Sequence, residues 1–137
     1  MRVVLDTCIL YSALRSSTGA SFHIINSLPA LKFRPVVSTP LFFEYEDVLS
    51  RPDQFPNLTS RDIDHFLDFV ASVAERQKIT FLWRPYLPDP NDDLVLEVAV
   101  AGQVDAIVTY NRKDFVGSDR FGIRILSPQE FIKECKL

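Results

Sequence analysis

Short apolar segments of strand length recur along this chain, separated by proline, glycine or polar residues. Runs of this kind are typical of buried β-strands. The pattern predicts five strands, at residues 2–6, 33–38, 78–83, 105–110 and 124–126.

Segments with a helical spacing of apolar residues lie between these strands. In "TSRDIDHFLDFVASVAERQ" one stripe collects Ile63, Phe66, Leu67, Val70, Val73 and Ala74, which predicts an amphipathic helix. Residues 8–15 are predicted to be helical or turn-like, and further helices are predicted at 20–28, at 40–50 after Thr39 as N-cap, in "DDLVLEVAVAG" and at the chain end. That last helix has Ser127 as N-cap, Pro128 at its first position and Glu130 completing a capping box.

Strands that alternate with helices predict a parallel sheet covered on both faces. The 137 residues suffice for one core, so we expect a single domain over residues 1–137. In such sheets ligands bind at the carboxyl ends of the strands. Asp6 follows the first strand and Thr109 lies at the end of the fourth, so both lie where a site is expected.

Composition narrows the choice of function. The net charge of −3 argues against a protein that coats nucleic acid by bulk electrostatics. The two cysteines, Cys8 and Cys135, form no zinc pattern and are predicted to be free thiols. No apolar run approaches membrane-spanning length and no signal segment is recognisable, so we expect a cytoplasmic protein without a membrane partner.

Four acidic residues fall at functional edges of this predicted fold: Asp6, Glu44, Asp93 and Asp114. Carboxylates gathered without basic partners repel one another unless cations neutralise them, and hard oxygen ligands select Mg²⁺ or Mn²⁺. Each residue alone has an ordinary alternative. Asp6 or Asp114 could cap a turn, Glu44 could be solvated, and Asp92 and Asp93 could favour a helix N-terminus through its dipole.

Four segments in order, "VVLDTCIL", "STPLFFEYEDVLSRP", "DPNDDLVLEVAVAGQVDAIVTYNRKDF" and "ILSPQEFI", resemble the PIN-domain ribonucleases. The resemblance is greatest to the toxins of toxin–antitoxin pairs. It implies a three-layer α/β/α fold with a central five-stranded parallel sheet ordered 3-2-1-4-5. It also implies a Mg²⁺- or Mn²⁺-dependent endonuclease that cleaves single-stranded RNA. The expected partners are a small antitoxin protein and further copies of the chain, as a homodimer or higher homo-oligomer.

The resemblance assigns Asp6, Glu44 and Asp93 to the family's first three acids. The fourth acid normally stands where this chain has Asn111, which can ligate through its carbonyl but carries no charge. Asp114 is the nearest remaining carboxylate, and a short helical turn through "NRKD" would bring it to the side of Asn111. The implied catalytic residues are therefore Asp6, Glu44, Asp93 and Asp114, and the implied metal ligands are Asp6, Asp93, Asn111 and Asp114.

Other residues are assigned supporting roles. Thr7 and Thr109 are expected to hydrogen-bond the acids or bound water. Arg15, Arg112 and Lys113 are candidates for contacts with substrate phosphates, with ordinary surface charge as the alternative. Tyr11, Phe42 and Phe43 either stack a base or pack in the core.

Two other classes of protein are alternatives to this interpretation. A phosphoacceptor receiver domain would need a phosphoacceptor aspartate after the third strand and a lysine after the fifth, where this chain has "TFLW" and "ILS". A catalytically degenerate PIN fold that binds RNA or protein stays open, because Asn111 removes one charge from the site.

Overall fold

The five strands in the described part of the chain form one parallel sheet. The computed structural model describes residues 1–28, 32–80 and 86–137, apart from the side chains of 119 and 120. The strand order is β3-β2-β1-β4-β5, which confirms the order 3-2-1-4-5. The strands are β1 (Arg2–Leu5), β2 (Arg34–Val37), β3 (Glu75–Arg76), β4 (Ala106–Val108) and β5 (Arg124–Leu126).

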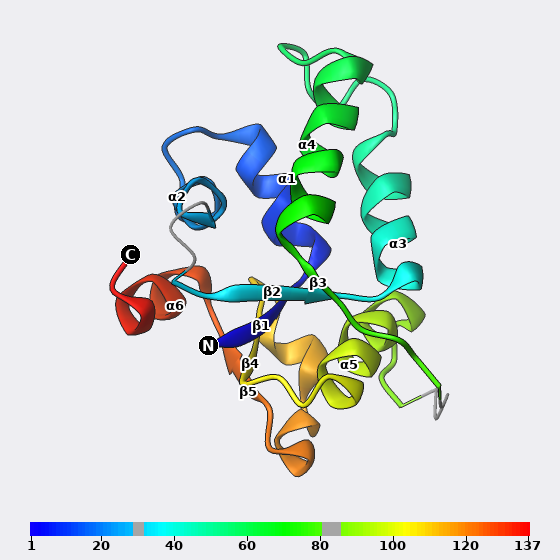
Figure 1. Cartoon of the computed structure of the whole chain (residues 1–137), viewed down its shortest axis with the longest axis vertical. Coiled ribbons are helices and arrows are strands. Elements are labelled where there is room, and N and C mark those ends of the chain that lie inside the picture. The colour runs from blue at the N-terminus through cyan, green and yellow to red at the C-terminus, as the bar shows by residue number, and fades with distance from the viewer. Residues whose placement is uncertain (29–31, 81–85) are drawn as a thin grey trace.

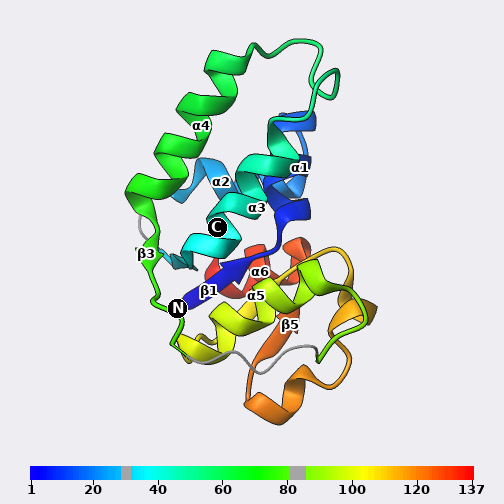
Figure 2. The same ribbon diagram turned by 90° about the vertical axis from the view of Figure 1, so that its right-hand side faces the viewer.

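Helices cover both faces of this sheet, as predicted for a three-layer fold. Figures 1 and 2 show α1 to α4 on one side of the sheet and α5 on the other. The helix α6 packs against α2 and β5. The helices are α1 (Thr7–Arg15), α2 (Ala20–Asn26), α3 (Thr39–Leu49), α4 (Ser60–Val73), α5 (Pro90–Ala101) and α6 (Pro128–Cys135). No helix within the described ranges has the length and apolarity that a membrane span needs.

The helix starts follow the capping residues closely. Ser127 accepts from the Glu130 amide and Glu130 accepts from the Ser127 amide, so the predicted capping box is confirmed. For α3 the predicted N-cap lies one residue too far along the chain. Ser38, not Thr39, is the N-cap, and its hydroxyl accepts from the Leu41 amide at 3.1 Å. Ser38 is buried, so this bond satisfies both the hydroxyl and a helix-end amide.

The third strand lies earlier in the chain than predicted. The sequence pattern placed it at 78–83, but β3 is Glu75–Arg76, and residues 81–83 lie outside the described part of the chain. Residues 78–80 have no regular structure. β3 pairs with β2 through Val36 and Val37, and the Gln77 amide continues the ladder to the Val37 carbonyl at 2.8 Å. Pairing with β2 therefore determines where β3 forms, ahead of the run of apolar residues.

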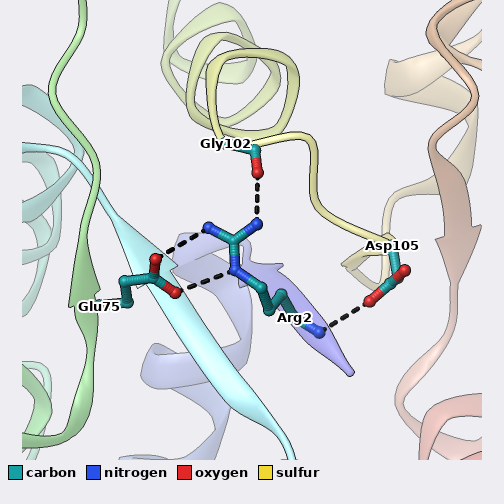
Figure 3. Close-up of polar contacts among 4 residues, drawn as sticks. All are labelled: Arg2, Glu75, Gly102 and Asp105. Carbon is teal, nitrogen blue, oxygen red and sulfur yellow. Dashed lines mark hydrogen bonds and ion pairs between the residues drawn. The ribbon is translucent and has the colours of Figure 1, made fainter.

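The amino end of the sheet is held by Arg2 (Figure 3). Its guanidinium donates to both carboxylate oxygens of Glu75, at 2.9 and 3.1 Å, and to the Gly102 carbonyl at the end of α5. Its backbone amide donates to Asp105 at 2.8 Å. One arginine thus ties β1 to the edge strand β3, to α5 and to the segment before β4.

Between these ends the central strands are buried. Val3, Val4 and all three residues of β4 have no exposed surface. The two strands are hydrogen-bonded neighbours in parallel register, with Leu5 opposite Val108. The residues that follow them, Asp6 and Thr109, therefore leave the sheet side by side.

Candidate functional site

Asp6 leaves β1 and precedes α1, but it does not cap that helix. It occupies the N-cap position, and its side chain makes no capping hydrogen bond. Its carboxylate instead accepts from the Thr109 hydroxyl at 2.6 Å, across 103 residues of sequence. Asp6 is 6% exposed and Thr109 is fully buried, so this bond holds an acid at the rim of the core. Asp6 therefore occupies the N-cap position of α1, while its side chain bonds across the sheet to Thr109.

Three further groups surround Asp6. The Cys8 thiol lies 3.4 Å from its Oδ2, and the Thr7 backbone amide also donates to the carboxylate. Burial, and secondly the charge of Asp6, raise the pKa of Cys8 to about 12, so the thiol stays protonated and donates. The buried Tyr45 hydroxyl of α3 donates to the Leu5 carbonyl, one residue before Asp6. Thr7 thus acts through its backbone, whereas Thr109 uses the predicted side chain.

The adjacent acids at the start of α5 point in different directions. Asp93 is 1% exposed, and its carboxylate accepts from the Leu87 amide at 2.9 Å and the Tyr86 amide at 3.3 Å. It is turned toward the segment before the helix. Asp92 is half-buried, and the charges of Asp6 and Asp114 both act on it. The charges of Asp6 and Asp114 thus act on Asp92, whereas the Asp93 carboxylate accepts from backbone amides.

Glu44 and Asp114 reach the same region from other elements. Glu44 lies on α3, is half-buried, and interacts electrostatically with Asp6. Asp114 lies in the 3₁₀ helix η2 (Arg112–Phe115), and its charge acts on Asp6 and on Asp92. The predicted turn through "NRKD" is present, since the Asp114 amide donates to the Asn111 carbonyl at 3.0 Å.

Asn111 is exposed, and its backbone amide donates to the Thr109 hydroxyl oxygen at 3.0 Å. The same hydroxyl therefore joins Asp6 to the start of the segment that carries Asp114. A threonine at the end of β4 can make both bonds because its oxygen donates once and accepts as well.

Burial and, after it, like charges act on the acidic cluster, by which we mean Asp6, Glu44, Asp92 and Asp114. Burial raises the pKa of Asp6, although its hydrogen bonds lower it, and Asp114 raises it further. Burial, with the charges of Asp6 and Asp114, raises the pKa of Asp92 to about 7. Burial also raises the pKa of Glu44, where Asp47 adds to the shift and Arg51 opposes it. Among the described residues, no ion pair neutralises any of the four.

The acidic cluster does not form a closed metal cage. Within the described residues, no three His, Cys, Asp or Glu side chains lie close enough together to hold a metal ion. Asp114 is exposed and Glu44 is half-buried, so both have room to change rotamer. The donors of the acidic cluster are carboxylate oxygens, and this donor chemistry fits Mg²⁺ or Mn²⁺.

The basic candidates Arg15, Arg112 and Lys113 are all exposed. Arg15 donates to the Tyr11 hydroxyl at 2.9 Å, and its guanidinium stands 5.6 Å from the Tyr11 ring centroid. Arg112 forms an exposed ion pair with Glu130 at 3.2 Å. Of the aromatic candidates, Phe43 is 60% exposed, whereas Phe42 and Tyr11 pack partly against the core.

Asp92 is the one member of the acidic cluster that sequence reasoning passed over. Both acids fall in the first turn of a helix with Asp89 as N-cap, where either satisfies the helix dipole. The pattern of apolar residues along α5 does not separate them. Only the amides of Tyr86 and Leu87, which take up Asp93, distinguish the two positions.

The sequence and the fold of this chain were compared with those of known proteins. The family model described as "PIN domain" matches residues 2–113. A crystal structure of VapBC2 from Rickettsia felis, bound to a DNA fragment from their promoter, contains a chain of similar fold. The two chains superpose with a TM-score of 0.61 at 18% sequence identity, over 93% of this chain and 98% of that one. Among curated proteins no sequence match was found.

Proposed function

This chain belongs to the PIN-domain family, and on that basis we propose that it is a metal-dependent endoribonuclease that cleaves single-stranded RNA. PIN domains are in general nucleases that use divalent metal ions. The observation that carries the proposal is the acidic cluster at the carboxyl ends of β1 and β4. Burial and the repulsion between carboxylates raise the pKa of Asp6 and Asp92, and no ion pair within the described residues offsets this, so a cation would relieve a destabilising arrangement.

Asp6, Asp92 and Asp114 are the proposed metal ligands, with Asn111 as a neutral ligand and Glu44 nearby. This set replaces Asp93 with Asp92, because the Asp93 carboxylate is engaged by backbone amides. When bound, Mg²⁺ or Mn²⁺ supplies positive charge that polarises a phosphodiester and lowers the pKa of a water. The Thr109 hydroxyl holds Asp6 in one orientation, and the protonated Cys8 thiol supports it. The proposed role of Glu44 is to accept a proton from an attacking water.

The substrate phosphates are proposed to contact the surface cations near the cluster. Lys113 and Arg112 lie in η2 beside Asp114, and Arg15 lies at the end of α1. The ion pair of Arg112 with Glu130 is more than 40% exposed on both sides, so little free energy opposes its exchange for a phosphate. The proposed role of these residues is to offset the repulsion between the acidic cluster and an anionic substrate.

A toxin role follows as a further part of the proposal. The neighbouring fold comes from VapBC2, a toxin–antitoxin complex. We therefore expect a small antitoxin protein as partner, a homodimer or higher homo-oligomer, and action in the cytoplasm. Co-expression with the product of an adjacent small reading frame, followed by co-purification, tests the partner. A chain that never retains that product contradicts the toxin part and leaves the nuclease part standing.

Cleavage of a fluorescently labelled single-stranded RNA tests the nuclease. We expect cleavage with Mn²⁺ or Mg²⁺, none after EDTA treatment, and none with Asp6→Asn. Asp105→Asn is the matched control, because it makes the same change at the other end of the sheet, where Asp105 accepts from Arg2. Cleavage that survives EDTA would refute the metal mechanism.

The second candidate is a PIN fold that binds RNA or protein without cleaving it. Asn111 and the absence of a preformed three-ligand site among the described residues favour it. RNA binding without cleavage at any Mn²⁺ concentration would select this candidate.

A further inference from the structure

The segment before α5 folds back onto the first turn of that helix. Asp89 caps the helix by accepting from the Asn91 amide at 2.9 Å, and Pro90 occupies the first helical position. The two residues at the start of the described segment, Tyr86 and Leu87, aim their amides at one carboxylate, that of Asp93. Leu87 is 5% exposed and Asp93 is 1% exposed, so this contact is shielded from water.

We propose that Asp93 is a positioning residue, which clamps this segment onto α5 and thereby holds Asp92 toward Asp6 and Asp114. The proposal rests on the proposed function, since its consequence is tighter binding of the divalent ion. Asp93 itself does not touch the ion, because its oxygens are taken by the Leu87 amide at 2.9 Å and the Tyr86 amide at 3.3 Å.

The clamp also reaches the segment that carries Asp114. The Tyr86 ring packs edge-on against Phe121, with ring centroids 5.4 Å apart, and its hydroxyl lies 3.5 Å from the Gly117 carbonyl oxygen. Phe121 ends η3 (Ser118–Phe121), which follows η2 and Asp114. A side chain at Gly117 would place its Cβ 3.3 Å from the Tyr86 hydroxyl, and the φ of +95° also favours glycine there.

Asp93 therefore connects two segments that bear repelling charges. Asp92 and Asp114 act on each other electrostatically, and this repulsion favours separation of their segments when no cation lies between them. The contacts from Asp93 to Tyr86, and from Tyr86 to Gly117 and Phe121, oppose that separation. Holding repelling ligands together before the ion arrives reduces the reorganisation that binding requires.

A carboxylate suits this role better than an amide would, but an amide keeps part of it. The two carboxylate oxygens accept from two different N–H groups. Asparagine offers one acceptor oxygen and would turn an NH₂ group toward the second donor. Asp93→Asn should therefore keep the Leu87 bond, whereas Asp93→Ala should lose both.

Mn²⁺ titration by calorimetry on the full chain tests the proposal, with amide hydrogen exchange as an independent reading. We expect Asp92→Asn to weaken binding by about 30-fold, Asp93→Ala by about tenfold, and Asp93→Asn by less than about threefold. Exchange at the Leu87 amide should accelerate in Asp93→Ala and stay slow in Asp93→Asn. If the alanine variant does not fold, Asp93→Ser serves as the truncation, with the same expected order.

Two results would overturn the positioning role. If Asp93→Asn binds Mn²⁺ as weakly as Asp92→Asn does, Asp93 is a direct ligand of the ion. Asp93→Ala with a lower melting temperature but wild-type Mn²⁺ affinity would make the clamp purely structural. A wild-type chain that binds no Mn²⁺ contradicts the proposed function instead, and this result is distinguishable because it appears before any variant is compared.

Discussion

At the two ends of the sheet, the pKa values of acidic side chains shift in opposite directions. At the amino end, hydrogen bonds and ion pairs with Arg2 and Arg124 lower the pKa of Glu75 and Glu134. At the carboxyl end, burial and mutual repulsion raise the pKa of Asp6, Glu44 and Asp92. Both ends belong to the same strands, so the difference arises from the partners that the fold supplies and not from the residue types.

This contrast separates stability from function. Acids paired with arginines favour the folded chain, because their charged forms are better stabilised there than in the unfolded chain. The acidic cluster disfavours the folded chain, because the charged forms of its side chains are less stable there than in the unfolded chain. Strain of this kind persists where a ligand relieves it. Substitutions at the two ends should therefore have opposite effects on activity and on stability.

The largest expected effect is the loss of cleavage in Asp6→Asn and Asp92→Asn. Each change keeps the shape of the side chain and removes a charge, so RNA cleavage should fall by about 100-fold or more. The melting temperature should stay the same or rise, because repulsion is reduced. Initial rates and thermal denaturation measure both. Full RNA cleavage by Asp6→Asn would contradict a functional role for the acidic cluster, regardless of the cleavage measured for Asp105→Asn.

The next effect concerns the number of charges around Asn111. Asn111→Asp should strengthen Mn²⁺ binding or add a second site, and Asp114→Asn should weaken binding, each by about tenfold. Calorimetric titration gives affinity and stoichiometry together. Two tight sites in the wild type that neither change affects would show that the fourth ligand lies elsewhere.

At the amino end, Arg2→Ala should reduce stability and leave cleavage unchanged. The change removes the bonds to Glu75 and Gly102 that hold the two-residue strand β3 at the sheet edge. Because this arginine is partly exposed, we expect a loss of about 1 kcal/mol in the free energy of unfolding. Urea denaturation measures this loss. A large loss of RNA cleavage at full folding would mean that the two ends are coupled.

The smallest expected effect is a pH dependence of the metal-free chain. The pKa of Asp92 is raised from 3.8 to about 7, so ionisation opposes folding. Stability from this residue is therefore highest below about pH 4 and declines as the pH rises toward 7, where the loss is complete. Solvent screening limits the change to about 1 kcal/mol or less, since Asp92 is only half-buried.

Thermal denaturation in EDTA, compared between wild type and Asp92→Asn, measures this pH effect. The difference between the two should grow from pH 4 to pH 7 and then stay level. A difference that is constant across that range would show that Asp92 does not titrate as its surroundings indicate. Above pH 7, added Mn²⁺ should restore the stability of the wild type more than that of the variant.

Several features could be predicted from the sequence because local residues determine them. The capping box of Ser127 and Glu130 involves residues three apart and forms wherever a helix starts there. The apolar runs of β1 and β4 made their burial and their parallel arrangement predictable. Asp6 and Thr109 were each predicted at the carboxyl end of a strand, and in the structure a hydrogen bond joins them.

Other features were decided only by contacts between distant segments. β3 formed where a partner strand and Arg2 were available, at Glu75 and Arg76, and residues 78–80 after it have no regular structure. Asp92 and Asp93 are chemically identical neighbours at the start of one helix, so no local pattern distinguishes them. The amides of Tyr86 and Leu87, in the segment that folds back onto α5, donate to the Asp93 carboxylate. The charges of Asp6 and Asp114 act on the Asp92 carboxylate instead.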